Sequence, residues 1–242
     1  MAEHIKPYSQ DENKKGQVSK MFDNIAPYYD FLNRFLSLGV DTIWRKKAIN
    51  ELKELDPKKI LDVATGTGDV AIEMTKRLNP THIIGLDISK EMLEIGKKKI
   101  KKRKLHEIID MEVGDSENLR FEDNTFDAIT VAFGVRNFEN LEKGIAEMNR
   151  VLKKDGKLIV LEFSRPSVFP IKQAFNFYFK YILPLIGRLT SKDKRAYSYL
   201  YESVQAFPEG NNFIKVLDKT GFKSNTCKRL SLGICSIYTG IK

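Results

Sequence analysis

Cysteine, histidine and tryptophan are scarce in this sequence of 242 residues, and their scarcity removes several classes of protein. The two cysteines, Cys227 and Cys235, have no metal-ligand companions, and no secretory signal is recognisable. We therefore expect a reduced, cytoplasmic environment in which both are packing residues. His4, His82 and His106 are scattered along the chain, so we expect no metal site and no catalytic histidine.

Long apolar runs, internal repeats and low-complexity linkers are also missing. No apolar run is long and uninterrupted enough to span a bilayer. The length and the hydrophobic content of 42% are ordinary for a single α/β domain with a packed core. The sequence therefore predicts one domain that covers residues 1–242.

Positive charge is in excess, with 41 lysines and arginines against 32 acidic residues and a net charge of +9. Much of this charge lies in residues 97–104, at the end of a predicted helix whose first turns are acidic. A solvated helix end explains the block, because the helix dipole favours basic residues there. Contact with anionic lipid headgroups at the inner face of the membrane is the alternative.

A glycine turn follows a short apolar run in residues 59–70, which read K-I-L-D-V-A-T-G-T-G-D-V. The apolar run suits a buried parallel strand, whereas Gly66 and Gly68 permit a tight turn and leave no side chain between backbone and ligand. Thr67 stands beside the free amides of the helix that should follow. The segment predicts a strand, a loop and a helix that together hold an adenosine group.

The next two apolar runs end in polar residues. Asp87 could accept both hydrogen bonds of a ribose diol, and Asp115 with Ser116 could meet the edge of an adenine. The glycine pattern and Asp87 also satisfy the dinucleotide fingerprint, so a nicotinamide-dependent oxidoreductase is one alternative. A tight turn without any ligand is another.

The periodicity of apolar residues divides the chain into a helical N-terminal part and an alternating core. About the first fifteen residues are polar, and we expect them to be mobile and without function. Helices should fill the rest of residues 1–55, and strands should alternate with helices from residue 56. Two runs separated by Ser-Leu-Gly predict a closing antiparallel hairpin. The expected strands after the glycine loop are 81–87, 108–113, 126–133, 157–163, 222–230 and 234–241.

Several groups of residues at ordered spacing extend over nearly the whole chain. They are Tyr29-Asp30-Phe31-Leu32-Asn33, Ser37 and Trp44; Phe133-Gly-Val-Arg-Asn137; Arg150-Val-Leu-Lys153, Gly156, Glu162 and Ser164; and Tyr197-x-Tyr-Leu200, Ser203 and Phe207-Pro208. These groups resemble the signatures of the UbiE/COQ5 quinone C-methyltransferases, within the class I S-adenosylmethionine-dependent methyltransferases. The resemblance implies a Rossmann-like α/β fold, with N-terminal helices and a doubly wound sheet of seven strands that closes in the antiparallel hairpin.

Three positions depart from the pattern of that family. Ala64 stands in place of the first loop glycine, and Lys154-Asp155 replaces Pro-Gly. Asp41 stands where the first signature usually has histidine. If that histidine accepts a proton in relatives, a carboxylate could do the same, but we favour the interpretation that Asp41 caps a helix.

The resemblance implies methylation of a ring carbon of a polyprenyl quinol by S-adenosylmethionine, without a metal. We favour demethylmenaquinol over 2-polyprenyl-6-methoxy-1,4-benzoquinol as the acceptor. The chain lacks an Asn/Asp-Pro-Pro-aromatic sequence and a Pro-Cys nucleophile, so we expect no nucleic-acid partner. Whether the protein forms a homo-oligomer stays open. The predicted cofactor contacts are Gly66, Thr67, Gly68, Asp87, Asp115 and Ser116.

Catalysis requires an activated ring carbon, because an aromatic carbon is a poor nucleophile until the neighbouring hydroxyl loses its proton. Arg136 and Asn137 follow the fourth strand at the edge of the sheet where ligands bind, and we expect them to stabilise the quinol anion. A surface ion pair is the alternative for Arg136. Tyr29 and Asp30 are weaker candidates for lining the acceptor pocket or relaying the proton, with helix packing as the alternative.

A stretch rich in aromatic residues, 171–187, lies between the fifth strand and the last helix. Lys172, Lys180 and Pro184 interrupt it too often for a membrane span. We expect residues 165–207 to form a helical lid insertion. Its aromatic face could be packed in the core, line a channel for a polyprenyl tail, or rest on the membrane.

Overall fold

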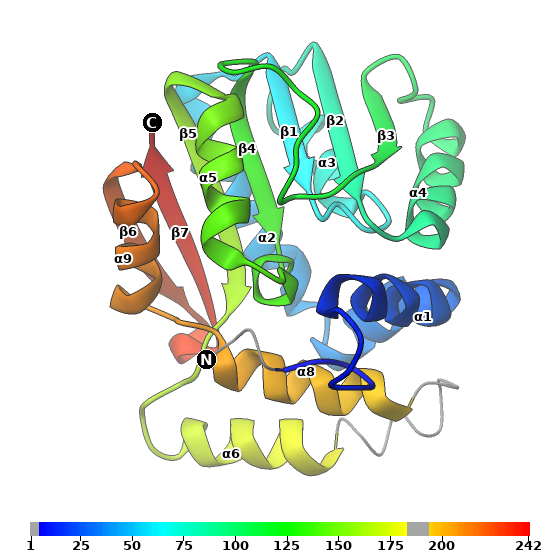
Figure 1. The fold of residues 1–242 in the computed structure, drawn as a ribbon, viewed down its shortest axis with the longest axis vertical. Helices are drawn as coiled ribbons and strands as arrows, with labels where there is room; N and C mark the ends of the chain where they lie inside the picture. Colours follow the sequence, from blue (N-terminus) through cyan, green and yellow to red (C-terminus); the bar gives the residue numbers. More distant parts are fainter. Residues whose placement is uncertain (1–4, 183–193) are drawn as a thin grey trace.

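A computed structural model describes residues 5–182 and 194–242. Its centre is a seven-stranded sheet in the order β3-β2-β1-β4-β5-β7-β6 (Figure 1). Strands β1 to β5 are parallel, and β7 pairs antiparallel with both β5 and β6. This topology confirms the predicted doubly wound sheet with its closing hairpin. The strands are β1 Lys59–Val63, β2 His82–Asp87, β3 Ile109–Val113, β4 Phe126–Ala132, β5 Leu152–Phe163, β6 Lys223–Leu230 and β7 Cys235–Ile241.

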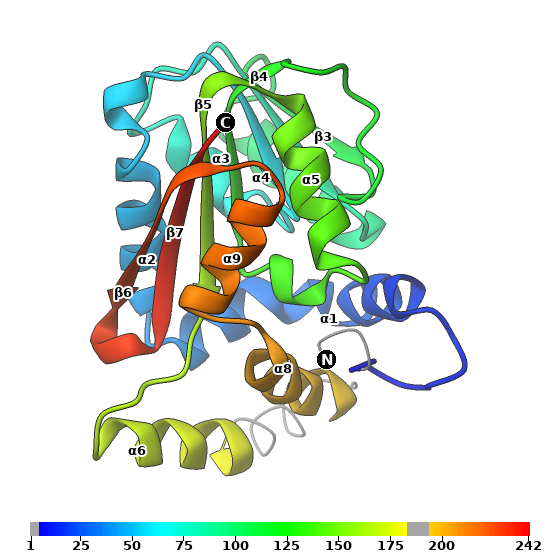
Figure 2. The same ribbon diagram turned by 60° about the vertical axis from the view of Figure 1, so that its left-hand side comes forward.

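Helices cover both faces of the sheet, because its central strands are apolar on both sides. Helices α2, α3 and α4 pack on one face, and α5 and α9 pack on the other (Figures 1 and 2). The helices are α1 Lys14–Leu36, α2 Val40–Asn50, α3 Asp69–Met74, α4 Lys90–Lys102, α5 Leu141–Val151, α6 Ile171–Phe177, α8 Lys194–Ala206 and α9 Asn211–Lys219, with shorter helical turns at Lys53–Leu55, Val135–Asn137, Tyr178–Ile182 and Ser231–Gly233.

Two predicted boundaries differ from the structure by more than one residue. The apolar pattern predicts that the helix after the glycine loop extends to about Leu78, but α3 ends at Met74 and turns follow it. Strand β5 begins five residues earlier than predicted, at Leu152, because a bulge opposite β4 inserts the polar segment 153–156 into the strand. A polar run of this kind has no alternation of apolar residues to mark it as a strand.

The predicted mobility of the N-terminal segment is wrong for the described residues. The amide of Gln17 donates to the carbonyls of Ser9 and Glu12, and its carbonyl oxygen accepts from the backbone of Tyr8 and Ser9. Lys14 is buried, and its ammonium donates to backbone carbonyl oxygens of the loop after β4. The error arose because these polar side chains bond to the fold and are not left in water.

A further layer lies beyond the carboxyl ends of the parallel strands, where α1, α8 and α6 cross beneath the sheet (Figure 1). Their contacts form a third apolar core that includes Met21, Leu32, Phe175, Phe179 and Tyr199. Residues 183–193 of the predicted lid insertion lie outside the described residues. In the part of the chain that is described, no helix has the length and apolar character that crossing a membrane requires.

Candidate active site

Two adjoining cavities open where the parallel strands end. The first, of about 80 Å³, lies over the loops after β1, β2, β3 and β4. The second is larger, about 490 Å³, and lies between those loops and the layer of α1, α2, α6 and α8. Four residues line both cavities and so mark the place where they meet: Phe22, Tyr29, Phe133 and Asn137.

The glycine loop forms one wall of the first cavity. Ala64, Gly66 and Gly68 all have positive φ, the conformation that glycine tolerates best. The amide of Gly66 donates to Asp87 Oδ2 at 2.8 Å, and the amide of Ser89 donates to Asp87 Oδ1 at 2.9 Å. Burial raises the pKa of Asp87, and these amide bonds oppose that shift. The carboxylate is therefore held in one orientation at the cavity wall.

Asp115 and Ser116 line the same cavity after β3. Asp115 Oδ1 accepts from the amide of Glu117 at 2.9 Å, and Oδ2 pairs with the ammonium of Lys15 at 2.6 Å. Lys15 also reaches Glu117 at 3.3 Å. Burial alone would lower the pKa of Lys15, but the hydrogen bond to Asp115 and both negative charges raise it above the ordinary value.

Lys15 is a site residue that the sequence did not reveal. It lies in a segment that we expected to be mobile, a hundred positions before Asp115. Two acidic residues close together, Asp115 and Glu117, favour a cation nearby. Nothing in the sequence indicates which of the many lysines provides it.

Thr67 and Gly68 do not line either cavity. The Thr67 hydroxyl donates to Asp30 Oδ1 at 2.5 Å, and Lys99 donates to Thr67 at 3.0 Å. Asp30 also lies outside both linings, where it pairs with Lys99 at 2.8 Å. These residues support the glycine loop from behind. Lys99 belongs to the block interpreted as a solvated helix end, and it departs from that interpretation.

Arg136 lies in the turn after β4 and lines the second cavity. Its guanidinium donates to Glu162 Oε1 at 2.7 Å and to the carbonyl oxygen of Phe133 at 2.5 Å. Both partners of the ion pair are buried, so the surface ion pair considered above is wrong. Burial raises the pKa of Glu162, and the charge of Arg136 opposes that shift.

Hydrogen-bonding capacity remains unused around Arg136. Among the described residues, Arg136 Nε, Asn137 Oδ1 and the Tyr199 hydroxyl are buried without a hydrogen-bond partner. Such groups are costly unless a ligand or water satisfies them. Tyr29 is bonded to Asn33, and burial raises its pKa, so its hydroxyl stays protonated. Together these groups form a polar end in a cavity that is otherwise apolar.

Aromatic side chains make up much of the remaining wall of the second cavity. Phe163 lies 4.7 Å from Phe133 with the two rings tilted, and it meets the edge of Phe179 at 5.8 Å, measured between ring centroids. Phe179 in turn stacks on Phe175 at 4.2 Å. This wall can hold an apolar ligand of considerable length.

Asp41 also lines the second cavity, and the prediction that it caps a helix is wrong. The N-cap of α2 is Gly39, and Asp41 is the second residue of the helix. Its carboxylate accepts from the Ser37 hydroxyl at 2.7 Å and pairs with Arg45 at 3.2 Å. Bonds to side chains thus replace the expected bond to a backbone amide.

No candidate metal site is found among the described residues. The described residues contain no group of three or more histidine, cysteine, aspartate or glutamate side chains arranged to hold a metal ion. The first cavity instead offers carboxylates beside backbone amides, which suits a nucleoside, and the second offers a polar end in an apolar chamber.

Comparisons with known proteins agree with this geometry. The model of the ubiE/COQ5 methyltransferase family matches residues 9–242. The chain is 52% identical over 240 residues to a demethylmenaquinone methyltransferase of Bacteroides fragilis, covering 99% of this chain and 98% of that one. It is 46% identical over 231 residues to a ubiquinone/menaquinone biosynthesis C-methyltransferase of Geotalea daltonii, covering 95% and 98%.

Solved structures share the fold at low sequence identity. A SAM-dependent methyltransferase of Thermotoga maritima has a TM-score of 0.67 and 18% identity, covering 93% of this chain and 99% of that one. The [4+2]-cyclase SpnF has a TM-score of 0.59 and 18% identity, covering 94% and 96%. Because the second protein is named for a different reaction, these similarities show the fold alone.

Proposed function

The chain belongs to the ubiE/COQ5 methyltransferase family, and we propose that it methylates a ring carbon of demethylmenaquinol to give menaquinol. It is an S-adenosylmethionine-dependent methyltransferase, which rules out the nicotinamide-dependent alternative. The observation that carries the proposal is 52% identity over nearly the whole of a chain named for this substrate. The Geotalea relative is named for both quinone types, so a methoxy-benzoquinol is the competing acceptor.

The first cavity has the groups that S-adenosylmethionine requires. Asp87 offers a fixed carboxylate to the ribose diol, and Asp115 with Ser116 offers acceptors to the adenine edge. Gly66 lets the backbone approach the ligand, whereas Thr67 and Gly68 act by shaping the loop. When bound, S-adenosylmethionine supplies an electrophilic methyl group. The residues of the chain must align that group with the acceptor and exclude water.

The second cavity suits the quinol. We place the ring at the polar end, where Arg136, Asn137 and Tyr29 adjoin the first cavity, and the polyprenyl tail along the aromatic wall. Arg136 is a permanent cation that donates hydrogen bonds, so it stabilises the quinol anion that forms before the methyl group moves. In this arrangement, helices α1 and α2 and the described helices of the lid insertion, α6 and α8, enclose the acceptor.

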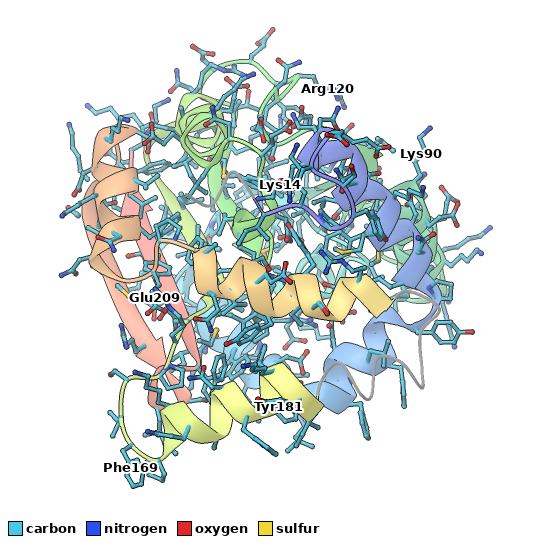
Figure 3. All side chains as sticks on the ribbon, turned by 60° about the horizontal axis from the view of Figure 1, so that its bottom comes forward. Lys14, Lys90, Arg120, Phe169, Tyr181 and Glu209 are labelled. Carbon is cyan, nitrogen blue, oxygen red and sulfur yellow. The ribbon has the colours of Figure 1, made fainter. Side chains whose placement is uncertain are left out.

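The mouth of the second cavity supports a peripheral contact with the membrane. Leu38 lines the cavity yet is 88% exposed, which locates the opening beside the turn between α1 and α2. Phe169 and Tyr181 are also exposed, and Figure 3 shows them at the outer edge along α6. Lys172 and Lys180 are exposed on the same segment and complement anionic headgroups.

Product mass distinguishes the two acceptors. The full chain is incubated with isotopically labelled S-adenosylmethionine and either reduced demethylmenaquinol or the methoxy-benzoquinol. We expect a labelled methyl group on the naphthoquinol ring, and liposomes should increase the rate for long-chain substrates. Labelling of the benzoquinol alone would show that the benzoquinol, and not demethylmenaquinol, is the acceptor. Equal rates with and without liposomes would contradict the proposed membrane contact.

A further inference from the structure

Among the described residues that line the second cavity, Asp41 is the one that carries a carboxylate. The other titratable groups in this lining are tyrosines and arginines. Asp41 is only 4% exposed, so its surroundings and not bulk water fix its hydrogen bonds. No histidine lines the cavity in the described parts of the chain. Apart from Asp41, the described lining offers no carboxylate or imidazole that could accept a proton.

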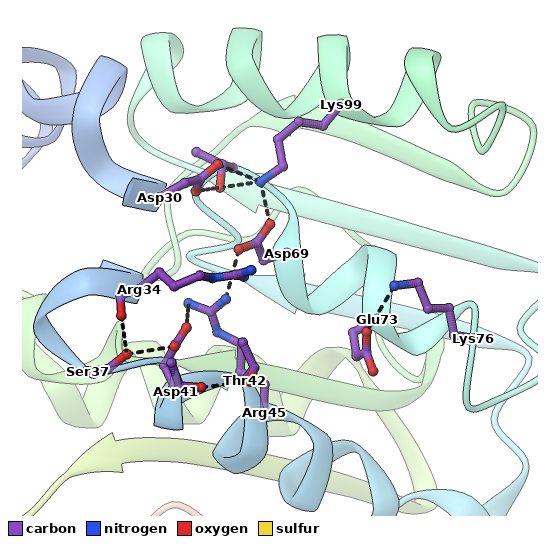
Figure 4. Close-up of polar contacts among 12 residues, drawn as sticks. Asp30, Arg34, Ser37, Asp41, Thr42, Arg45, Asp69, Glu73, Lys76 and Lys99 are labelled. Carbon is purple, nitrogen blue, oxygen red and sulfur yellow. Dashed lines mark hydrogen bonds and ion pairs between the residues drawn. The ribbon is translucent and has the colours of Figure 1, made fainter. Parts of the chain in front are cut away.

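Asp41 ends a chain of alternating charges that passes from α2 to α1 (Figure 4). Arg45 of α2 pairs with Asp41 at 3.2 Å and with Asp69 at 2.8 Å. Lys99 of α4 then pairs with Asp69 and with Asp30, the latter at 2.8 Å. Three carboxylates thus share two cations, which leaves one negative charge in excess. Asp41 is the end of this chain at the cavity, and Asp30 is the other end.

The other charged pair of the cavity cannot accept a proton in the same way. Arg136 and Glu162 neutralise each other, and the guanidinium of Arg136 has only donors. Glu162 is fully buried and already accepts from Arg136 and from the amide of Phe163. Arg136 can stabilise a quinolate, but another group must take the proton that makes it.

Tyr29 connects the two polar clusters. It lines both cavities, and the charges of Arg45 and Arg136 both act on its hydroxyl. Arg45, the partner of Asp41, therefore lies close enough to Tyr29 to act on it, and Tyr29 stands where the two cavities meet. A quinol hydroxyl at this end can meet donors on one side and the carboxylate on the other.

We propose that Asp41 accepts the proton of the quinol hydroxyl beside the carbon that is methylated, an inference that rests on the proposed function. Loss of this proton gives a quinolate, whose neighbouring ring carbon bonds to the methyl group while the sulfur–methyl bond breaks and its electron pair goes to sulfur. The methylated ring, now a dienone, loses the hydrogen of that carbon to water. Asp41 then returns its proton to the ring oxygen, so each turnover releases one proton.

The test compares Asp41→Asn with the wild type on a reduced short-chain demethylmenaquinol and on a ring-fluorinated derivative whose hydroxyl is more acidic. We expect Asp41→Asn to lower kcat by about 10²- to 10³-fold on the first quinol, which lies within the range for general acid–base catalysis. The loss should be smaller on the fluorinated quinol and should shrink as the pH rises. Thermal melting and binding of S-adenosylmethionine establish that the variant is folded.

Two further variants separate proton transfer from structural support. Asp41→His should regain part of the activity, with an acid limb at higher pH than in the wild type, because imidazole is more basic than a carboxylate. Asp69→Asn is the matched control, since it removes a bond of Arg45 from outside the cavity. It should leave the shape of the pH profile unchanged.

The outcomes keep the two proposals apart. A wild-type chain that binds S-adenosylmethionine but methylates neither quinol contradicts the proposed function. An active wild type with an unchanged kcat in Asp41→Asn contradicts only the role of Asp41. Equal losses on both quinols with an unaltered pH profile also overturn that role, because they indicate a structural effect.

Discussion

The two cavities lie at the same edge of the sheet but are built in different ways. The first is formed mainly by the short loops after consecutive strands, and backbone amides at those strand ends orient Asp87 and Asp115. The second is enclosed by α1, α2, α6 and α8, and side chains from distant parts of the chain orient one another there. Local sequence therefore determines the cofactor side, whereas packing between helices determines the acceptor side.

The largest effect should come from the acceptor side. Arg136→Ala should lower kcat by about 10²- to 10³-fold, as the loss of one donor to a developing anion does. It also leaves Glu162 buried without its partner, which should destabilise the fold by about 3–5 kcal/mol. Steady-state kinetics and thermal melting measure the two effects. Unchanged turnover with intact cofactor binding would remove the proposed role.

The double variant Arg136→Gln with Glu162→Gln is the control for this stability loss. It removes both charges together, so it should recover much of the lost stability while turnover stays low. Recovery of turnover along with stability would show that Arg136 acts through the fold and not on the acceptor.

On the cofactor side, Asp87→Asn should weaken binding of S-adenosylmethionine and leave kcat at saturation nearly unchanged. Hydrogen bonds to a charged group contribute about 1.5–3 kcal/mol, so we expect a loss of about 10- to 100-fold in affinity. Calorimetric titration measures it. Asp110→Asn is the control, because that carboxylate lies on the neighbouring strand with 69% of its side chain exposed. Similar losses in both variants would refute a specific role for Asp87.

Asp62 is a buried carboxylate in β1, just before the glycine loop, and its charge lowers the stability of the fold at neutral pH. Burial raises the pKa of Asp62 from 3.8 to about 6, against bonds from Thr65 and Thr130. The folded chain therefore holds the proton more tightly than the unfolded chain. This group favours folding below 3.8, and that contribution is lost as the pH rises through about 6.

Asp62→Asn should therefore stabilise the fold at neutral pH by about 1–3 kcal/mol, since one pKa unit corresponds to about 1.4 kcal/mol. Chemical denaturation at several pH values measures the gain, which should vanish in acid. A gain that does not depend on pH would indicate a packing effect in place of the titration.

The smallest effect should come from Lys15, which connects α1 to the cofactor side. Lys15→Ala should raise the KM for S-adenosylmethionine by about two- to fivefold, since partly exposed ion pairs contribute about 0.2–1 kcal/mol. Lys20→Ala is a control on the same helix, since Lys20 is exposed. Equal effects of the two substitutions would show that Lys15 acts only through the overall positive charge and not through its ion pair with Asp115.

The sequence predicted the order of strands and helices well, because apolar periodicity and the glycine loop depend on nearby residues. The carboxylates at strand ends were recognised for the same reason. Ser89 precedes the helix with the acidic first turn, which is typical of an N-cap, and its hydroxyl accepts from the amide of Met92 at the start of α4. Asp41 resembled a cap by the same local criterion, but its partners Ser37 and Arg45 became evident only from the structure.

Other features depended on contacts that no local pattern encodes. The burial of Lys14 and the pairing of Lys15 with Asp115 require the path of α1 beneath the sheet. The burial of Arg136 depends on Glu162, a residue of the next strand. Each of these contacts joins segments that are separate in the chain, so composition and spacing could not indicate them.

Because α1 contributes to the walls of both cavities, the exchange of one ligand has a mechanical consequence for the other. Lys15 and Val18 of this helix face the nucleoside side, Leu32 faces the acceptor side, and Phe22 and Tyr29 face both. A displacement of α1 that lets a new nucleoside enter would also change the wall that contacts the quinol. Binding of the two ligands should thus be interdependent, because one helix contacts both.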